Sequence, residues 1–299
     1  MRAYVNTPDG PVIEEVEEPV PAPDEALVAV QAFSINRGEL ALLTQRTNGW
    51  RPGQDVAGAL ARPAADGSGP AEGARVVGYV EGAGWAERVA VRTSQLAELP
   101  AAVTITDAAA LPVAGTTGLR TGRYGGDLLG RRVLITGASG AVGRFQIQLT
   151  AARGATVVAV ARHHADDLTG LGAAQVVPGV EDAEGEFPLI LEQLGGHVLQ
   201  AAIGKVARDG TIVFIGATLG DPTPISLYDF FGHENARLQS YFSYAYGPMG
   251  PDLRILVDLL ADGRLRAPVA YVADWTDLKA ALEALRERRV AGKIVLTVG

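Results

Sequence analysis

The feature that most constrains the fold of this chain is a run of three glycines at positions 137, 140 and 143, within the segment VLITGASGAVG (133–143). The apolar residues before it are typical of a buried strand, and residues 144–153 after it have helical spacing. Gly137 permits a tight turn, Gly140 allows the backbone to come close to a pyrophosphate, and Gly143 lets the helix pack on the strand. This order predicts the first βα unit of a dinucleotide-binding sheet. The alternative is a glycine turn in an unrelated α/β protein.

The segments around this loop predict two domains. Strands are expected at 132–136, 156–161, 174–177, 189–191 and 211–215, and helices near 164–171 and 197–207. Strands that alternate with helices indicate a parallel, doubly wound Rossmann sheet, which we place at residues 115–245. The first hundred residues contain short apolar runs between Pro- and Gly-rich turns, a pattern that predicts a small β-barrel or sandwich.

The glycine loop also indicates how a dinucleotide would bind. The start of the following helix offers free N–H groups and the positive end of its dipole to phosphates. The residues expected at the phosphates are Gly137, Ala138, Ser139, Gly140, Ala141, Val142 and Gly143.

The end of the second expected strand indicates which dinucleotide is preferred. An Asp or Glu there would bind the ribose 2′-hydroxyl of NAD, but this chain has Arg162 and His163 instead. A guanidinium at this position suits the 2′-phosphate of NADPH. The sequence therefore predicts NADPH as cofactor, although Arg162 as an ordinary solvated side chain is the alternative.

Composition excludes several function classes. The chain has 47% hydrophobic and 20% charged residues, as in globular proteins, and a net charge of −8 without a basic stripe. We therefore expect a small-molecule substrate, no nucleic-acid partner and no membrane partner. No secretory signal is evident at the start, so a cytoplasmic location is expected. The absence of cysteine excludes disulfides, Cys-ligated zinc and a thiolate nucleophile.

The segment TGASGAVG (136–143) also looks like the loop of short-chain dehydrogenases. Those enzymes place the loop near the N-terminus and use a Tyr-x-x-x-Lys pair. No tyrosine in this chain has a lysine four residues later, so this interpretation is rejected.

Several motifs in a fixed order carry a resemblance to a known family. They are SINRGE (34–39), PGQDVAG (52–58), GWAERV (84–89), AAALPVAGTT (108–117) and AGKIV (291–295). With them the chain resembles the medium-chain dehydrogenase/reductase superfamily, and within it the zinc-free quinone oxidoreductase and enoyl reductase branch that includes zeta-crystallin. The resemblance implies a GroES-like catalytic domain of residues 1–114 and 246–299, with the Rossmann domain inserted.

The resemblance also implies site residues. Asn36 and Thr117 are expected near the nicotinamide and the substrate; a turn-stabilising Asn36 and a helix-capping Thr117 are the alternatives. Further expected cofactor contacts are Gly216, Ala217, Tyr241, Phe242 and Ser243, and Glu39, Trp50 and Asp55 are expected to line the substrate pocket. Glu39 stands where the family has Asp, and Ala41 where it often has Tyr, so the resemblance does not imply a particular substrate.

These expectations define a reaction. All four histidines (163, 164, 197 and 233) lie in the cofactor half, so no Cys or His ligand for zinc exists in the catalytic domain. Without a Lewis acid the acceptor must already be activated, which suggests an enone, an enoyl thioester or a quinone. The alternatives are a quinone reductase of broad range and a non-catalytic NADPH-binding protein. A homodimer is expected to form through a sheet edge near residues 239–244.

Overall fold

The computed structural model describes residues 1–299, which form two compact units. Met1–Thr116 and Gly247–Gly299 form one of them, called here the β-rich unit, and Thr117–Tyr246 form the other, the α/β unit. The β-rich unit is therefore built from both parts of the chain that flank a continuous insertion. No helix in the chain is both long enough and apolar enough to cross a membrane.

The α/β unit contains a six-stranded sheet in the order β10-β9-β8-β11-β12-β13, with every neighbouring pair parallel. Its strands are β8 (Arg132–Ile135), β9 (Thr156–Val160), β10 (Ala173–Val177), β11 (Phe187–Glu192), β12 (Val206–Phe214) and β13 (Arg237–Ser240). From β8 the chain adds β9 and β10 on one side, and it then returns to add β11, β12 and β13 on the other side. This is the doubly wound Rossmann order. The predicted fold class is confirmed.

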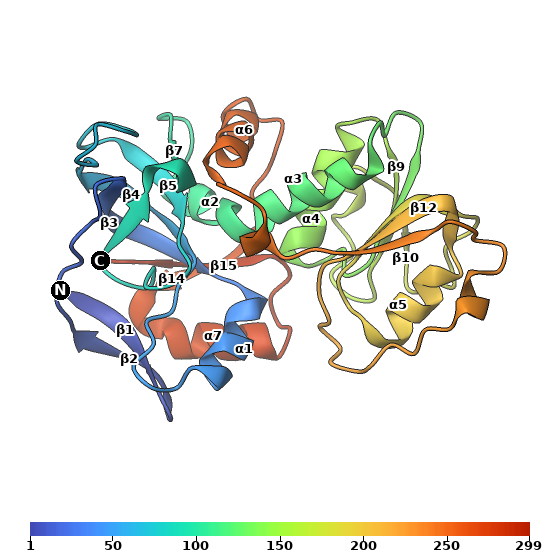
Figure 1. Cartoon of the computed structure of the whole chain (residues 1–299), viewed down its shortest axis with the longest axis horizontal. Coiled ribbons are helices and arrows are strands. Elements are labelled where there is room, and N and C mark those ends of the chain that lie inside the picture. Colours follow the sequence, from blue (N-terminus) through green and yellow to red (C-terminus); the bar gives the residue numbers. More distant parts are fainter. The chain divides into compact units, whose positions relative to one another are not determined.

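Helices on both sides of this sheet explain why its strands are apolar without interruption. Val133 and Ile135 pack in a core with Ile147 of α4, whereas Leu134 between them packs in a second core with Leu199 of α5. Figure 1 shows these two helices beside the sheet. The helices and 3-10 turns of the unit are α3 (Thr116–Gly122), η3 (Arg123–Gly125), α4 (Ala141–Ala151), η4 (Thr169–Leu171), α5 (Gly196–Ile203), η5 (Leu227–Phe230) and η6 (Ser243–Ala245).

The predicted helix at 164–171 is wrong. Only a 3-10 turn, η4, is present there, and His164 has a left-handed backbone with φ of 56°. Arg144 of α4 holds this segment by donating to the Asp167 carboxylate at 2.5 and 2.9 Å and to the His164 carbonyl at 3.2 Å. These contacts stabilise a turn, and the short segment has too few apolar residues to bury a helix face.

The β-rich unit contains a sheet in the order β14-β15-β3-β4-β5-β7, with β6 paired to β3, and a separate β1-β2 hairpin. The strands are β1 (Arg2–Thr7), β2 (Gly10–Glu15), β3 (Glu25–Ile35), β4 (Asp55–Arg62), β5 (Arg75–Tyr79), β6 (Arg88–Arg92), β7 (Leu96–Glu98), β14 (Val269–Asp274) and β15 (Lys293–Thr297). Strand β15 lies antiparallel to β3 and parallel to β14. The C-terminal segment therefore completes a sheet that the N-terminal segment begins.

Helices cover this sheet. They are α1 (Arg37–Gln45), α2 (Ile105–Ala109), the π-helical turn η2 (Leu111–Gly115), α6 (Gly250–Ala261) and α7 (Leu278–Arg286), with 3-10 turns η1 (Thr93–Gln95) and η7 (Trp275–Asp277). Helix α7 buries Leu278, Ala281, Leu282 and Leu285 in one core, the spacing of a single helix face. It contacts α1, and the two helices lie side by side in Figure 1.

Candidate functional site

The glycine loop connects β8 to α4 and has the backbone geometry that the sequence requires. Gly137 has φ of 59°, a region that favours glycine. A Cβ on Gly143 would lie 2.6 Å from the Cα of Ala138 and 2.7 Å from the carbonyl oxygen of Gly137, so only glycine fits there. The loop therefore folds back tightly onto the first turn of α4.

This loop leaves backbone donors for a ligand. Gly140 is the N-cap of α4 and has no side chain that could accept a hydrogen bond from the first N–H groups of the helix. Residues 141–143 are the first three of the helix, whose N–H groups have no partner within it. Donors of this kind and the helix dipole favour an anion such as a pyrophosphate. The loop thus fits the dinucleotide that the sequence predicts.

Arg162 and His163 lie just after β9, one residue beyond its end, and both are exposed. Neither side chain makes a hydrogen bond or an ion pair within the chain. Arg144, by contrast, is bound to Asp167 and to the Ser139 carbonyl at 2.8 Å. Arg162 is therefore free to bind a ligand, whereas Arg144 supports the loop.

The carboxyl ends of β8 and β11 carry a polar network that sequence reasoning missed. Glu192 is fully buried and accepts hydrogen bonds from the Thr136 hydroxyl at 3.0 Å and from the Leu194 and Gly195 N–H groups. Burial raises the pKa of the Glu192 carboxyl, against the smaller effect of these donors. Gln193 donates to the Thr136 carbonyl at 2.8 Å. The signal in the sequence is a charged residue, Glu192, at the end of an otherwise apolar strand.

The next loop packs closely on this network. Gly216 and Ala217 follow β12, and a Cβ on Gly216 would lie 3.0 Å from the Gln193 carbonyl oxygen. Thr218 donates its hydroxyl to the same oxygen at 3.0 Å. The loops after β8, β11 and β12 thus meet at the carboxyl ends of the strands, where doubly wound proteins bind ligands.

Thr117, a predicted catalytic residue, lies in α3 of the α/β unit and is buried. It is beside the hydroxyl of Tyr241, whose pKa is raised by burial and lowered to a smaller extent by Arg120 and Thr117. Tyr241 is buried and stacks on Tyr246 with ring centroids 4.9 Å apart. The structure thus brings Thr117 and Tyr241 together.

Phe242 and Ser243 follow Tyr241 but leave the sheet. Phe242 is exposed, and Ser243 begins the turn η6. The edge strand β13 ends at Ser240, so the predicted edge strand at 239–244 is wrong for its last four residues. The Tyr241 N–H still donates to the Phe214 carbonyl at 2.9 Å, and beyond it the chain leaves the sheet for the turn η6.

Asn36, the other predicted catalytic residue, belongs to a buried network in the β-rich unit. Its amide nitrogen donates to Asp55 Oδ2 at 2.9 Å, and its amide oxygen accepts from Lys293 Nζ at 2.7 Å. Lys293 Nζ also contacts Asp55 Oδ2 at 2.9 Å. Ser34 donates to that oxygen at 2.7 Å, so four side chains fix one another. One amide hydrogen of Asn36 remains without a partner.

Asp55 and Glu39 are fully buried, so their carboxyl groups face protein atoms. Asp55 Oδ1 accepts the Val113 N–H at 2.9 Å, and Glu39 Oε2 accepts the Asn36 N–H at 2.7 Å. Burial, and secondarily the charge of Asp55, raise the pKa of Glu39 to about 8. Glu39 therefore carries a proton at neutral pH. Lys293, which neutralises Asp55, was missed as a site residue.

Trp50, a predicted pocket residue, is half-buried at the end of the loop after α1. Its backbone pairs with Asn6, whose N–H donates to the Trp50 carbonyl at 2.8 Å. The Arg46 guanidinium lies 5.3 Å from the centre of the Trp50 ring.

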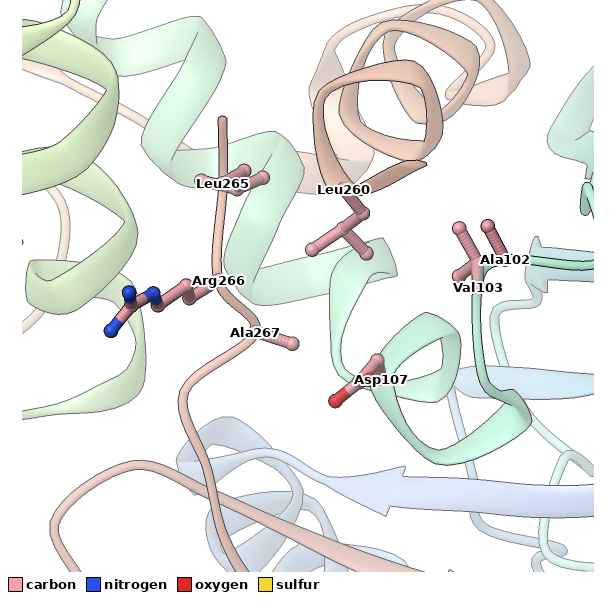
Figure 2. Close-up of a pocket in the computed structure, with 7 residues that line it drawn as sticks. All are labelled: Ala102, Val103, Asp107, Leu260, Leu265, Arg266 and Ala267. Atoms are coloured by element: carbon pink, nitrogen blue, oxygen red, sulfur yellow. The ribbon is translucent and has the colours of Figure 1, made fainter. Parts of the chain in front are cut away.

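A pocket of about 220 Å³ in the β-rich unit contains none of the predicted residues. Its lining, shown in Figure 2, is Ala102, Val103, Asp107, Leu260, Leu265, Arg266 and Ala267. The Asp107 carboxylate accepts a hydrogen bond from the hydroxyl of Thr104, the N-cap of α2, at 2.7 Å, so it is already engaged at the start of a helix. In Figure 2 the Arg266 guanidinium points away from the other lining side chains. This pocket offers no chemistry for a reaction.

Comparison with known proteins shows what the chain is similar to. Residues 153–296 match the family described as zinc-binding dehydrogenase. A probable zinc-binding oxidoreductase, mitochondrial, of Arthroderma benhamiae is 26% identical over 94% of this chain and 91% of its own length. Bovine quinone oxidoreductase-like protein 2 is 24% identical over 96% and 89%. The quinone oxidoreductase of Coxiella burnetii has the same fold, with a TM-score of 0.87, 22% identity and coverage of 100% and 99%. The chain is thus similar to oxidoreductases of the medium-chain dehydrogenase/reductase type.

These similarities support an oxidoreductase of the medium-chain dehydrogenase type, a kind of enzyme that uses a nicotinamide cofactor. The matched family is named for zinc, yet this chain has no cysteine. No group of three or more His, Cys, Asp or Glu side chains in it is arranged to hold a metal ion.

Proposed function

We propose that the protein is an NADPH-dependent, zinc-independent reductase that transfers hydride to an activated C=C bond, as in an enone or enoyl compound, or to a quinone. The observation that carries this proposal is the free guanidinium of Arg162, which follows β9 beside an open glycine loop. The free cation suits a 2′-phosphate, and the loop suits the pyrophosphate of the same cofactor.

The chain's own residues hold the cofactor in this proposal. The N–H groups of residues 141–143 bind the pyrophosphate, and Arg162, with His163 when protonated, binds the 2′-phosphate. The loops at Gly216 and Tyr241 border the rest of the dinucleotide. Bound NADPH supplies the hydride that the acceptor takes up.

The acceptor must be activated by its own conjugation. Asn36 is held in one orientation by Asp55 and Lys293 and keeps one amide hydrogen to donate to a developing oxyanion. The Thr117 hydroxyl is the second candidate donor. Glu39 and Asp55 are enclosed, so neither reaches an acceptor, and we propose that solvent supplies the proton.

A quinone acceptor is the second candidate, because relatives of this chain are named quinone oxidoreductases. Both acceptors use the same donors, and a quinone also spreads the incoming charge over a conjugated oxygen. A non-catalytic NADPH-binding protein is the remaining alternative.

An assay of NADPH oxidation separates these candidates. The purified protein is mixed with NADPH and, in turn, an α,β-unsaturated ketone and a benzoquinone, with and without a chelator. We expect turnover that the chelator does not reduce, and less than about one zinc per chain by elemental analysis. Turnover that is lost with the chelator and restored by zinc would refute zinc independence. Binding of NADPH without turnover of either acceptor would support the non-catalytic alternative.

Arg162 tests the cofactor preference directly. A charge-assisted contact to the 2′-phosphate contributes roughly 1.5–3 kcal/mol, or about 10- to 100-fold in affinity. We expect NADPH to bind at least about tenfold more tightly than NADH, and Arg162→Ala to remove most of that difference. Arg162→Asp should favour NADH, since it provides an acceptor for the 2′-hydroxyl. Fluorescence titration measures both affinities, and exposed Arg208→Ala is the control. An unchanged ratio in Arg162→Ala would show that this side chain does not contact the cofactor.

A further inference from the structure

Arg51 is a cation with buried donors that have no acceptor. It lies in the segment between α1 and β4, and its Nε and Nη2 atoms are buried without a hydrogen-bond partner. No other arginine or lysine in the chain has a buried side-chain nitrogen in this state. Donors on a charged group that are shielded from water and left unpaired are costly, so their retention needs a reason.

Other arginines that are partly enclosed are paired. Arg37 donates to a backbone carbonyl at 3.1 Å, Arg75 to two carbonyls at 3.0 and 2.6 Å, and Arg153 to a carbonyl at 2.7 Å. Arg144 is paired with a carboxylate. The fold thus gives these guanidinium groups acceptors, and Arg132, which makes no hydrogen bond, lies 4.5 Å from the centre of the Phe187 ring. Arg51 has neither kind of partner.

The surroundings of Arg51 contain no compensating charge. Burial lowers the pKa of its guanidinium, and no carboxylate acts in the opposite direction. Its backbone is nevertheless held firmly. The Ala83 N–H donates to the Arg51 carbonyl at 2.8 Å, and the Trp85 N–H donates to the Pro52 carbonyl at 3.1 Å. The backbone of Arg51 is therefore held in place, while its charged guanidinium group has no partner in the chain.

The third nitrogen shows where a ligand would approach. Nη1 has no partner in the chain and is the one guanidinium nitrogen that is not enclosed. Nη1 and Nη2 are bonded to the same carbon, so a ligand that reaches Nη1 would approach the edge formed by these two nitrogens. Two parallel N–H donors match the two oxygens of a carboxylate or phosphate.

We propose that Arg51 binds an anionic group, a carboxylate or a phosphate, carried by the acceptor substrate. This proposal rests on the proposed function and adds a substrate class to it: conjugated acceptors with a negatively charged group. The net charge of the chain is −8 and repels anions in general, so a preference for an anionic acceptor requires a local cation of this kind.

The kinetic test compares an anionic acceptor, 4-oxopent-2-enoate, with its neutral methyl ester, and each variant is compared with the wild type on the same acceptor. We expect the wild type to have a KM for the acid that is roughly 10- to 100-fold lower than for the ester. Arg51→Met should raise the KM for the acid by the same factor, leave kcat unchanged and leave the KM for the ester unchanged, because the contact is made equally in ground state and transition state. Arg51→Lys keeps the charge but loses the paired donors, so it should give an intermediate value. Arg62→Met, an exposed arginine of β4, is the matched control.

Calorimetry separates a failure of this proposal from a failure of the proposed function. Titration of 4-oxopent-2-enoate into the wild type, with and without NADP⁺, should give binding that Arg51→Met weakens and Arg62→Met does not, whether or not turnover is observed. Arg51→Met should melt at the same or a higher temperature, because it removes unpaired buried donors. Equal KM values for acid and ester in the wild type would overturn the proposal. A higher KM for NADPH instead of the acceptor would assign Arg51 to the cofactor, and a lower melting temperature would assign it to the loop.

Discussion

Replacement of Glu39 by glutamine should make the protein more resistant to alkaline pH. Glu39 is fully buried, and its pKa is raised from 4.5 to about 8, chiefly by burial. The unfolded chain therefore loses this proton near pH 4.5, and the folded chain loses it only near pH 8. Between these values unfolding releases a proton, so the free energy of unfolding falls as pH rises.

The size of this effect follows from the pKa difference. A gap of about 3.5 pH units at about 1.4 kcal/mol per unit gives an upper limit of about 5 kcal/mol lost between pH 4.5 and 8. That is a large part of the stability of an ordinary domain. Glutamine has the shape of the protonated acid and accepts the Asn36 N–H in the same way, but it cannot ionise. The loss should therefore disappear in Glu39→Gln.

Urea unfolding at several pH values from 5 to 8.5 measures this difference. The gain in stability of Glu39→Gln over the wild type should be near zero at pH 5 and should rise by roughly 1 kcal/mol per pH unit to pH 8. Glu283→Gln is the control, because Glu283 is exposed on α7. A difference between Glu39→Gln and wild type that stays constant over this range would refute the reasoning, since it would mean that Glu39 ionises equally in both states.

Three further changes test other parts of the structure. Gly143→Ala places a Cβ 2.6 Å from the Ala138 backbone, so it should lower the free energy of thermal unfolding by about 1–3 kcal/mol and weaken cofactor binding. Gly170 has open space around it, so Gly170→Ala should change neither. Lys293→Met leaves the Asp55 charge buried and unpaired, so it should lower the free energy of unfolding in urea by about 3–5 kcal/mol. Adding Asp55→Asn to this variant should recover most of that loss. No recovery in the double variant would contradict a direct pairing of Lys293 with Asp55. The protein should be a homodimer by light scattering, since β13 has a free sheet edge, and a monomer at micromolar concentration would contradict this.

The parallel sheet was predictable because local sequence and tertiary structure agree there. Residues 132–135 and 156–160 are apolar on both faces, and the fold covers both faces with helices. The segment 164–171 shows the limit of such reasoning. Its turn is held by Arg144, twenty residues and more away along the chain, and no local pattern reports that contact.

The candidate site was predictable only in part, for a similar reason. Motif position singled out Asn36 and Asp55 as residues of interest. Their partner Lys293 lies 257 and 238 residues away in the chain and meets them only because β15 pairs with β3. The unpaired state of Arg51 is likewise invisible in the sequence, because it consists of the absence of an acceptor that only a three-dimensional structure reveals.

The position of β15 in the sheet has a consequence for biosynthesis. Lys293 is made 238 residues after Asp55, which at about 5–20 residues per second is a delay of roughly 10 to 50 seconds on the ribosome. By the last part of that interval the α/β unit is complete and can fold, while the N-terminal segment still lacks β15, the strand that pairs with β3, and the cation for its buried carboxylate. We therefore expect nascent chains stalled after residue 246, once that residue has left the exit tunnel, to show a protease-resistant inserted unit and a protease-sensitive N-terminal segment. Equal resistance of both segments at that stage would contradict this order of folding.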